Sequence, residues 1–298
     1  MNITISGASG LIGRRLMKVL AADGHQLLVL SRHAGTNLPA GVRLFSWDPA
    51  RAEPPADSLS GADAVIHLAG ERVAQRWNTE VKRKIAASRV DGTRNLVLAL
   101  AKLTKRPQAL VCASAIGYYG SRGDEILTES SAPGSDFLAD ICVKWERAAR
   151  EAESLGMRVV SVRTGIVLDA RGGALARMLP PFRMGAGGPL ASGRQWMSWI
   201  HTADLAALFR HALLNPVSGP INGVSPNPVT NADFTRALAS TVRRPAFFPM
   251  PAVALKLMFG EMSEVLLASQ RVLPKAAEAA GFRFQFMDLG AAFSDLLK

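Results

Sequence analysis

The chain has few of the residues that build covalent or metal-bound scaffolds. It contains two cysteines, Cys112 and Cys142, in 298 residues, which excludes a disulfide framework and a four-cysteine zinc site. Its five histidines are dispersed, without a spacing that would bring them together as ligands, so no metal site is expected. Both cysteines are expected to be reduced thiols, as in a cytoplasmic protein.

Long apolar runs are also missing. No segment approaches the roughly 20 uninterrupted apolar residues of a membrane helix, and Met1 leads directly into an alternating strand instead of a secretory signal. The sequence therefore predicts a cytoplasmic protein with no membrane association.

Acidic residues are outnumbered by basic ones. Lys and Arg number 35 against 24 Asp and Glu, so the formal net charge is +11. The basic residues form short, scattered groups, and two tyrosines and five tryptophans do not form a stacking platform, so no nucleic acid is expected as a partner. A net positive field instead favours a small anionic ligand.

Strands and helices alternate in the first part of the chain. Alternating or short apolar segments predict strands, and apolar residues at helical spacing predict helices. Strands are expected at residues 2–6, 26–31, 42–47, 64–69, 109–113 and 158–163, with helices at residues 11–22, 78–105 and 137–155. This order predicts an α/β fold, a Rossmann-type doubly wound parallel sheet with helices on both faces.

The composition changes after Gly165. Residues 171–194 are rich in glycine and proline. Short helices are expected beyond them at residues 202–214, 231–242, 251–259 and 274–280, with brief strands at 221–224 and 283–286. We interpret residues 1–165 as the Rossmann domain and residues 166–298 as a smaller, mostly helical C-terminal substrate lobe over the carboxyl edge of the sheet.

A glycine-rich segment lies between the first strand and the first helix, where a dinucleotide loop is expected. Gly7 allows a tight turn, Gly10 lets backbone N–H groups approach a pyrophosphate, and Gly13 allows close packing of helix on strand. A glycine triplet is also compatible with a simple tight turn, but its position at the helix N-terminus favours phosphate binding. The predicted cofactor contacts in this loop are Gly7, Ser9, Gly10, Leu11, Ile12 and Gly13.

The second strand ends in Ser31 and Arg32. A site that prefers NAD normally carries an acidic residue here for the ribose 2′-hydroxyl, whereas an arginine accommodates a 2′-phosphate. Ser31 and Arg32 therefore predict NADP(H) as the cofactor, although an arginine at a strand end is often simply solvated.

Further motifs extend along the whole chain. They include residues 67–71 (HLAGE), 114–120 (SAIGYYG), 144–146 (KWE), 163–168 (RTGIVL), 187–190 (GGPL) and 199–201 (WIH). With the glycine loop, these residues resemble the extended short-chain dehydrogenase/reductases, in particular their epimerase-like branch, the NAD-dependent epimerase/dehydratase family. The resemblance implies a family-specific segment at the C-terminus and further cofactor contacts at Leu68, Ala69, Gly70, Lys84, Arg89 and Val167.

The catalytic residues of that superfamily are incomplete in this chain. The wider superfamily uses a serine that polarises a carbonyl, a tyrosine that transfers a proton, and a lysine four residues after the tyrosine. Ser114 fills the serine position, but the helix expected at 137–155 has no tyrosine. The remaining candidates are Tyr118 and Tyr119, which otherwise pack the pocket, and Lys144, which otherwise is a solvated or cofactor-contacting residue.

Candidate substrate contacts lie after the fourth strand and in the second lobe. Glu71 follows the HLAG segment, and glycines surround Arg183 and Arg194, as in a mobile loop that binds an anionic group. Gln195 is a further candidate. The alternative is that the two arginines are solvated surface residues.

These observations favour an NADP(H)-dependent oxidoreductase or epimerase-like enzyme that acts on a small molecule. The missing Tyr–Lys pair supports an alternative, a catalytically degenerate NADP(H)-binding sensor or regulatory protein.

Overall fold

A parallel sheet forms the centre of the computed structural model, which describes residues 1–32, 38 and 41–298. Its strands are β1 (Asn2–Ser6), β2 (Gln26–Ser31), β3 (Arg43–Ser46), β4 (Ala64–His67), β5 (Ala109–Ala115), β7 (Arg158–Thr164) and β11 (Gly219–Gly223). Across the described residues they lie in the order β11-β7-β5-β4-β1-β2-β3, with parallel neighbours throughout. The order changes direction between β1 and β4, and ligands bind at the carboxyl edge of such switch points.

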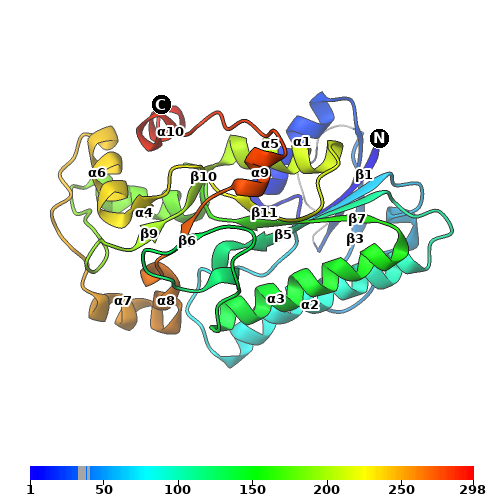
Figure 1. Ribbon diagram of the computed structural model, residues 1–298, viewed down its shortest axis with the longest axis horizontal. Helices are drawn as coiled ribbons and strands as arrows, with labels where there is room; N and C mark the ends of the chain where they lie inside the picture. Colours follow the sequence, from blue (N-terminus) through cyan, green and yellow to red (C-terminus); the bar gives the residue numbers. More distant parts are fainter. Residues whose placement is uncertain (33–37, 39–40) are drawn as a thin grey trace.

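Helices cover both faces of this sheet (Figure 1). The long helices are α1 (Leu11–Ala22), α2 (Thr79–Ala101), α3 (Phe137–Arg150) and α5 (Thr202–Leu214). Helices α1 and α5 pack together on one face, and α2 and α3 lie side by side on the other (Figure 1). The predicted doubly wound α/β fold is therefore confirmed.

The uninterrupted apolar strands follow from this two-sided burial. In β4, the neighbouring residues Val65 and Ile66 are both fully buried but belong to opposite cores. Val65 packs in the core that contains Leu96 of α2, and Ile66 in the core that contains Leu16 of α1. Successive side chains of a strand point to opposite faces, so a sheet covered on both sides needs apolar residues at every position.

The second lobe lies at the left of Figure 1 and combines short helices with two-stranded ladders. Its helices include α4 (Gly173–Arg183), α6 (Asn231–Val242), α7 (Ala252–Phe259), α8 (Ser263–Leu267) and α10 (Leu289–Leu296). The ladders join β8 (Ile166–Leu168) to β10 (Trp199–His201), β9 (Trp196–Met197) to β12 (Val229–Thr230), and β6 (Ile126–Leu127) to β13 (Arg271–Val272). Trp199, Phe234 and Phe293 are fully buried in the core of this lobe.

Two segments differ from the domain division expected from the sequence. Helix α5 and strand β11, which were expected in the second lobe, complete the main sheet and its helical layer. The strand expected at residues 283–286 is instead an irregular segment with a bend at Gln285. Its Gln285 and Phe286 N–H groups donate hydrogen bonds to the buried carboxylate of Asp204. Helix α9 (Lys275–Ala279) precedes this segment and packs against β11.

The part of the chain that the structure describes contains no helix with both the length and the apolarity needed to cross a membrane.

Candidate functional site

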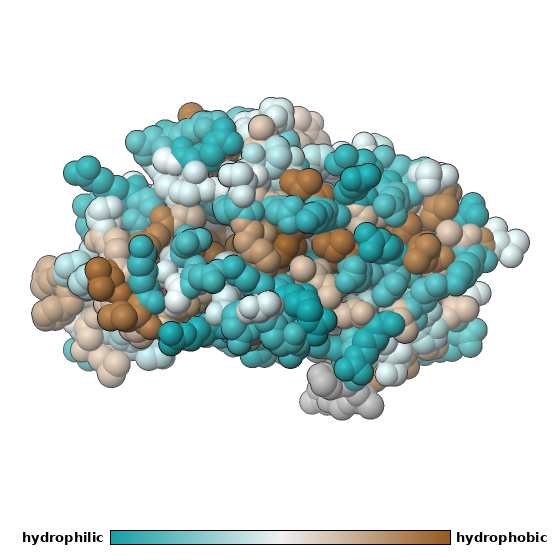
Figure 2. Space-filling view, turned by 90° about the horizontal axis from the view of Figure 1, so that it is seen from below, coloured by the Kyte–Doolittle hydropathy of each residue, from teal (hydrophilic) through white to brown (hydrophobic). Residues whose placement is uncertain are grey.

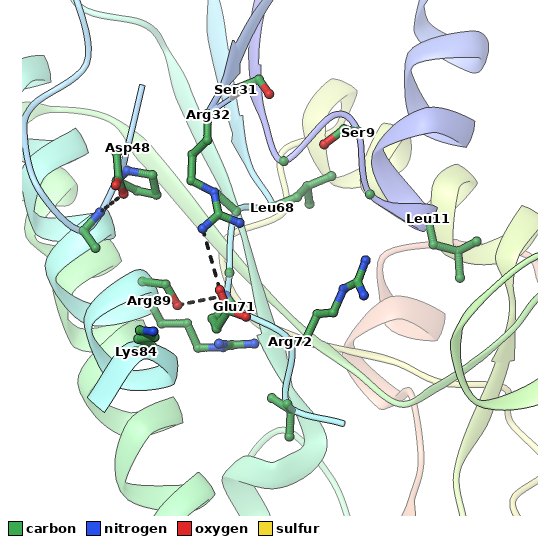
Figure 3. A pocket seen from close by; sticks show the side chains of 18 of the residues that line it. Ser9, Leu11, Ser31, Arg32, Asp48, Leu68, Glu71, Arg72, Lys84 and Arg89 are labelled. Atoms are coloured by element: carbon green, nitrogen blue, oxygen red, sulfur yellow. Dashed lines mark hydrogen bonds and ion pairs between the residues drawn. The ribbon is translucent and has the colours of Figure 1, made fainter. Parts of the chain in front are cut away.

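An open cleft of about 1210 Å³ lies at the carboxyl edge of the sheet, around the switch point between β1 and β4 (Figure 3). It brings together most of the residues that the sequence suggested as cofactor contacts. The predicted residues that line it are Gly7, Ser9, Gly10, Leu11, Ser31, Arg32, Leu68, Ala69, Gly70, Glu71, Lys84 and Arg89.

The glycine loop can be built only with glycine at two of its positions. Gly7 has a φ of +72°, and a Cβ there would lie 2.6 Å from the carbonyl carbon of Leu68. A Cβ on Gly13 would lie 2.5 Å from the carbonyl oxygen of Gly7. These contacts are shorter than van der Waals contact, so the loop, β4 and α1 fit together only because neither residue has a side chain.

The loop leads directly into α1 and leaves its first amides available. Gly10 occupies the N-cap position of α1, and as a glycine it has no side chain with which to cap those amides. The unpaired N–H groups and the helix dipole favour a negatively charged group at this end. The loop therefore has the form of a cradle for a pyrophosphate.

A buried serine–histidine pair, which the sequence analysis missed, supports the base of this loop. Ser6 Oγ lies 2.6 Å from His67 Nδ1 and accepts a hydrogen bond from the N–H of Ala69, at 3.3 Å. Burial lowers the pKa of His67 to about 4, so the imidazole is neutral at physiological pH. The pair ties the end of β1 to the end of β4, which are the two strands on either side of the cleft.

Charged side chains from three segments meet beside the cleft. Arg32, at the end of β2, forms an ion pair with Glu71, with 3.7 Å between Nη1 and Oε2 (Figure 3). The N–H of Glu71 donates to Ser88 Oγ at 2.9 Å, which fixes the backbone after β4 against α2. Arg89 packs over the ring of Trp145 at 5.2 Å, and burial lowers its pKa. Lys84 is more exposed and pairs with Glu80 on its own helix.

A smaller, mostly apolar pocket of about 410 Å³ adjoins the cleft on the side of the second lobe. It shares Gly7, Gly10 and Leu11 with the cleft and adds Val167, which the family resemblance suggested as a cofactor contact. Ile12, Gly13 and Ala113 also line it. The cleft and this pocket together give a continuous path over the glycine loop toward the end of β5.

Ser114 belongs to a buried polar network under that end of the sheet. Its hydroxyl donates to Glu146 Oε1 at 2.6 Å, and Arg163 donates two hydrogen bonds of 2.8 Å to the same carboxylate. The Glu146–Arg163 pair is almost fully buried, and Glu146 raises the pKa of Arg163 although burial opposes its charge. Sequence analysis placed both residues in family motifs but gave neither a role, because they face each other only after α3 packs on β7.

The two tyrosines contact this network in different ways. The guanidinium of Arg163 lies over the ring of half-buried Tyr118, 3.4 Å from its centroid. Tyr119 is fully buried, donates to Asn222 Oδ1 at 2.7 Å and accepts from Arg163 at 3.1 Å. Burial raises the pKa of Tyr119 to about 12, so its phenol is neutral at physiological pH. Lys144 lies apart from them on the exposed side of α3, paired with Asp140 at 2.7 Å.

The second lobe supplies different arginines to the cleft from those expected. Within the described residues, Arg183 and Arg194 are exposed and lie outside the cleft lining, and Gln195 is buried with its amide bonded to the carbonyl of Leu190. Arg171, two residues before α4, and Arg177, on α4, line the cleft instead.

These two arginines are held in different ways. Arg171 is anchored by the buried carboxylate of Asp169 at 2.9 Å, and Arg177 donates across the cleft to the carbonyl of Ala74 at 2.8 Å. Sequence analysis expected a glycine- and proline-rich segment over residues 171–194, so it identified neither Arg177 on α4 nor Arg171 two residues before that helix.

A parallel sheet with a glycine cradle and a basic cleft at its switch point defines a dinucleotide-binding protein of the Rossmann type. The chain belongs to the NAD dependent epimerase/dehydratase family, because the model of that family matches residues 3–225. A second match, to a domain of unknown function (DUF1731), covers residues 250–296. The family resemblance suggested by the sequence motifs is thus confirmed.

Relatives match the chain over nearly its full length. An epimerase family protein of Mycobacterium bovis, Mb2239, is 42% identical over 97% of this chain and 95% of its own. A chloroplastic SDR39U1 homologue of Arabidopsis thaliana is 41% identical over 96% of this chain and 84% of its own. Among solved structures, human epimerase family protein SDR39U1 (isoform 2) with NADPH superimposes with a TM-score of 0.90 at 36% identity, covering 99% of both chains.

Proposed function

We propose that the chain binds NADP(H) in the cleft around the glycine loop. The observation that carries the proposal is the cradle in which Gly7 and Gly13 leave no room for a Cβ atom and the first amides of α1 are not capped by Gly10. The human relative whose structure contains NADPH has the same fold over the full chain, which supports this assignment.

The residues of the cleft fit the parts of this cofactor. The amides of the glycine loop would hold the pyrophosphate. Arg32 would hold the 2′-phosphate, since neither Ser31 nor Arg32 is acidic. Val167 and Ala113, which line the apolar pocket, would contact the nicotinamide end. When bound, the nicotinamide donates or accepts a hydride.

The proposed activity is an NADP(H)-dependent oxidoreductase or epimerase reaction on a small molecule. Ser114 and Tyr118 are the proposed catalytic residues. Both contact the Glu146–Arg163 pair, Ser114 through its hydroxyl and Tyr118 through its ring. This pair holds Ser114 at the end of β5, and the hydroxyl would act as donor to a substrate carbonyl by turning its O–H away from Glu146.

Titration calorimetry with NADPH tests the binding step, and the absence of measurable binding would reject the proposed function. A screen of carbonyl and nucleotide-sugar compounds, followed at the nicotinamide absorbance, tests the reaction. Turnover that is lost in Ser114→Ala, with NADPH affinity retained, is the expected result.

A second candidate is an NADP(H)-binding sensor that has lost catalysis. It is favoured by the positions of two groups that proton transfer would require: Tyr119 is fully buried, and Lys144 is solvent-exposed and paired with Asp140. Tight NADPH binding without turnover on any substrate class would support this candidate over the enzyme.

The cytoplasm remains our proposed compartment. Cys112 and Cys142 are both buried free thiols, as expected in a reducing environment. The Arabidopsis relative is named as chloroplastic, so localisation of a tagged chain in its own cells is the measurement that decides this point.

A further inference from the structure

Large apolar side chains are exposed together at one end of the second lobe. They come from the end of α4, the α6–α7 connection and α7, and we call them the apolar knob: Met184, Phe247, Phe248, Val253, Leu257 and Met258. Phe247 is 80% exposed and Phe248 67%. Figure 2 shows apolar side chains gathered at the left-hand end, where α7 lies in Figure 1. A contiguous exposed apolar patch marks an interaction site more often than scattered apolar residues do.

The backbone holds the two phenylalanines outward. The N–H of Met250 donates to the carbonyl of Pro189 at 2.9 Å, and the N–H of Ala191 donates to the carbonyl of Met250 at 2.9 Å. A Cβ on Gly188 would lie 1.8 Å from the carbonyl oxygen of Phe248, so only glycine permits this close approach. The connection is therefore fixed to the lobe through its main chain, while its aromatic side chains project into solvent.

The parts of the knob lie close to one another. Gly185, next to Met184, lies beside Pro245: a Cβ on that glycine would be 3.6 Å from the proline ring. Val253 and Leu257 are four residues apart and share one face of α7.

Basic side chains flank the knob. Arg183 precedes Met184, Arg243 and Arg244 precede Phe247, and Lys256 lies on α7; all four are exposed. Of the nearby carboxylates, Glu261 is paired with Lys82, and Glu264 lies on α8. Two copies of the chain would bring these basic rims together, and like charges oppose such an interface. An anionic surface is complementary to it.

We propose that the apolar knob inserts into the surface of an anionic phospholipid membrane, with its basic rim against the lipid headgroups. Aromatic and aliphatic side chains bordered by arginine and lysine are the features of proteins that bind at the membrane interface without crossing it. The sequence analysis expected no membrane association because it searched for a spanning segment, and α7, with 8 residues, is far too short to span a bilayer.

Flotation of the full chain with lipid vesicles tests the proposal. We expect binding to vesicles of phosphatidylcholine mixed with phosphatidylserine, weaker binding to phosphatidylcholine alone, and loss of binding at high salt. The double variant Phe247→Ser/Phe248→Ser should reduce the bound fraction about tenfold or more. Arg243→Glu/Arg244→Glu should remove the preference for phosphatidylserine.

Leu98→Ser is the matched control, because Leu98 is a half-exposed apolar residue near the C-terminal end of α2, whereas α2 contacts the region of α7 through its N-terminal end. This variant should bind vesicles as the original chain does. Unchanged circular dichroism and thermal midpoints establish that each variant is folded. Absence of flotation at low salt, or equal flotation of the phenylalanine double variant, would overturn the proposal. Sedimentation equilibrium that shows a dimer dissolved by the double variant would overturn it too, in favour of a second copy.

Discussion

Replacing Arg32 with alanine should change the choice of cofactor more than the stability of the protein. The guanidinium is about half exposed and forms an ion pair of 3.7 Å with Glu71, which is a long separation for such a pair. An exposed pair of this kind contributes about 0–1 kcal/mol, so the variant should remain folded.

The expected loss of affinity in Arg32→Ala is for NADPH. A hydrogen bond to a charged group contributes about 1.5–3 kcal/mol, which corresponds to a decrease of roughly 10- to 150-fold in affinity. NADH has no 2′-phosphate, so its affinity should change by less than about threefold. Calorimetric titration of both cofactors into Arg32→Ala and the original chain measures the two effects.

Two further variants control this experiment. Arg94 matches Arg32 in exposure, at 52% against 53%, and also pairs with a carboxylate, that of Asp91 at 3.3 Å. Arg94→Ala should leave both affinities unchanged. Glu71→Gln should raise NADPH affinity by up to about fivefold, because the carboxylate no longer competes with the phosphate for Arg32. Equal losses for NADPH and NADH in Arg32→Ala, or a loss for neither, would refute the assignment of Arg32 to the 2′-phosphate.

Three other predictions follow from buried groups and close backbone contacts. Gly7→Ala should abolish NADPH binding and lower the thermal midpoint. Gly61 has a similar φ of +73° but open space around its Cβ, so Gly61→Ala should lower the free energy of unfolding by about 1–2 kcal/mol through backbone strain and should keep NADPH binding. Glu146→Gln should lower the free energy of unfolding by about 3–5 kcal/mol, because Arg163 is left buried without a counter-charge. Glu80→Gln, which breaks an exposed pair with Arg83, should leave the midpoint of the same urea titration nearly unchanged. Burial lowers the pKa of His67 from 6.5 to about 4, and that of His201 likewise to about 4. The unfolded chain therefore takes up protons first, so stability should be fully present above about pH 6.5 and fall as the pH decreases toward 4; urea midpoints that stay constant over this window would contradict it.

The parts of the fold that depend on local sequence were predictable. The alternation in β1 and the glycines of the loop each specify their own conformation, so the strand–loop–helix unit and the position of the cleft followed from residues 2–22 alone. Asn78 and Asp136 cap α2 and α3 through their side chains, which places the starts of both helices within a residue or two of prediction.

The parts that depend on contacts distant in sequence were not predictable. A strand was expected at residues 221–224, but its start at Gly219 and Pro220, which have low strand propensity, and its place in the main sheet depend on pairing with the edge of β7. Arg177 reaches Ala74 across 103 residues, and Glu146 reaches Arg163 only after α3 and β7 come together. The spacing along the chain carries no signal for either pair.

The position of β11 in the sequence, after several elements of the second lobe, determines where the chain can be truncated. After β7 the chain forms β8, α4, β9 and β10 of the second lobe. It then forms helix α5 and strand β11, which belong to the main sheet and its helical layer. A fragment cut at residue 165 would have an open sheet edge at β7 and an uncovered apolar face on α1, two features that promote aggregation. The two halves are therefore interwoven modules, and deletion studies should remove internal loops rather than either end.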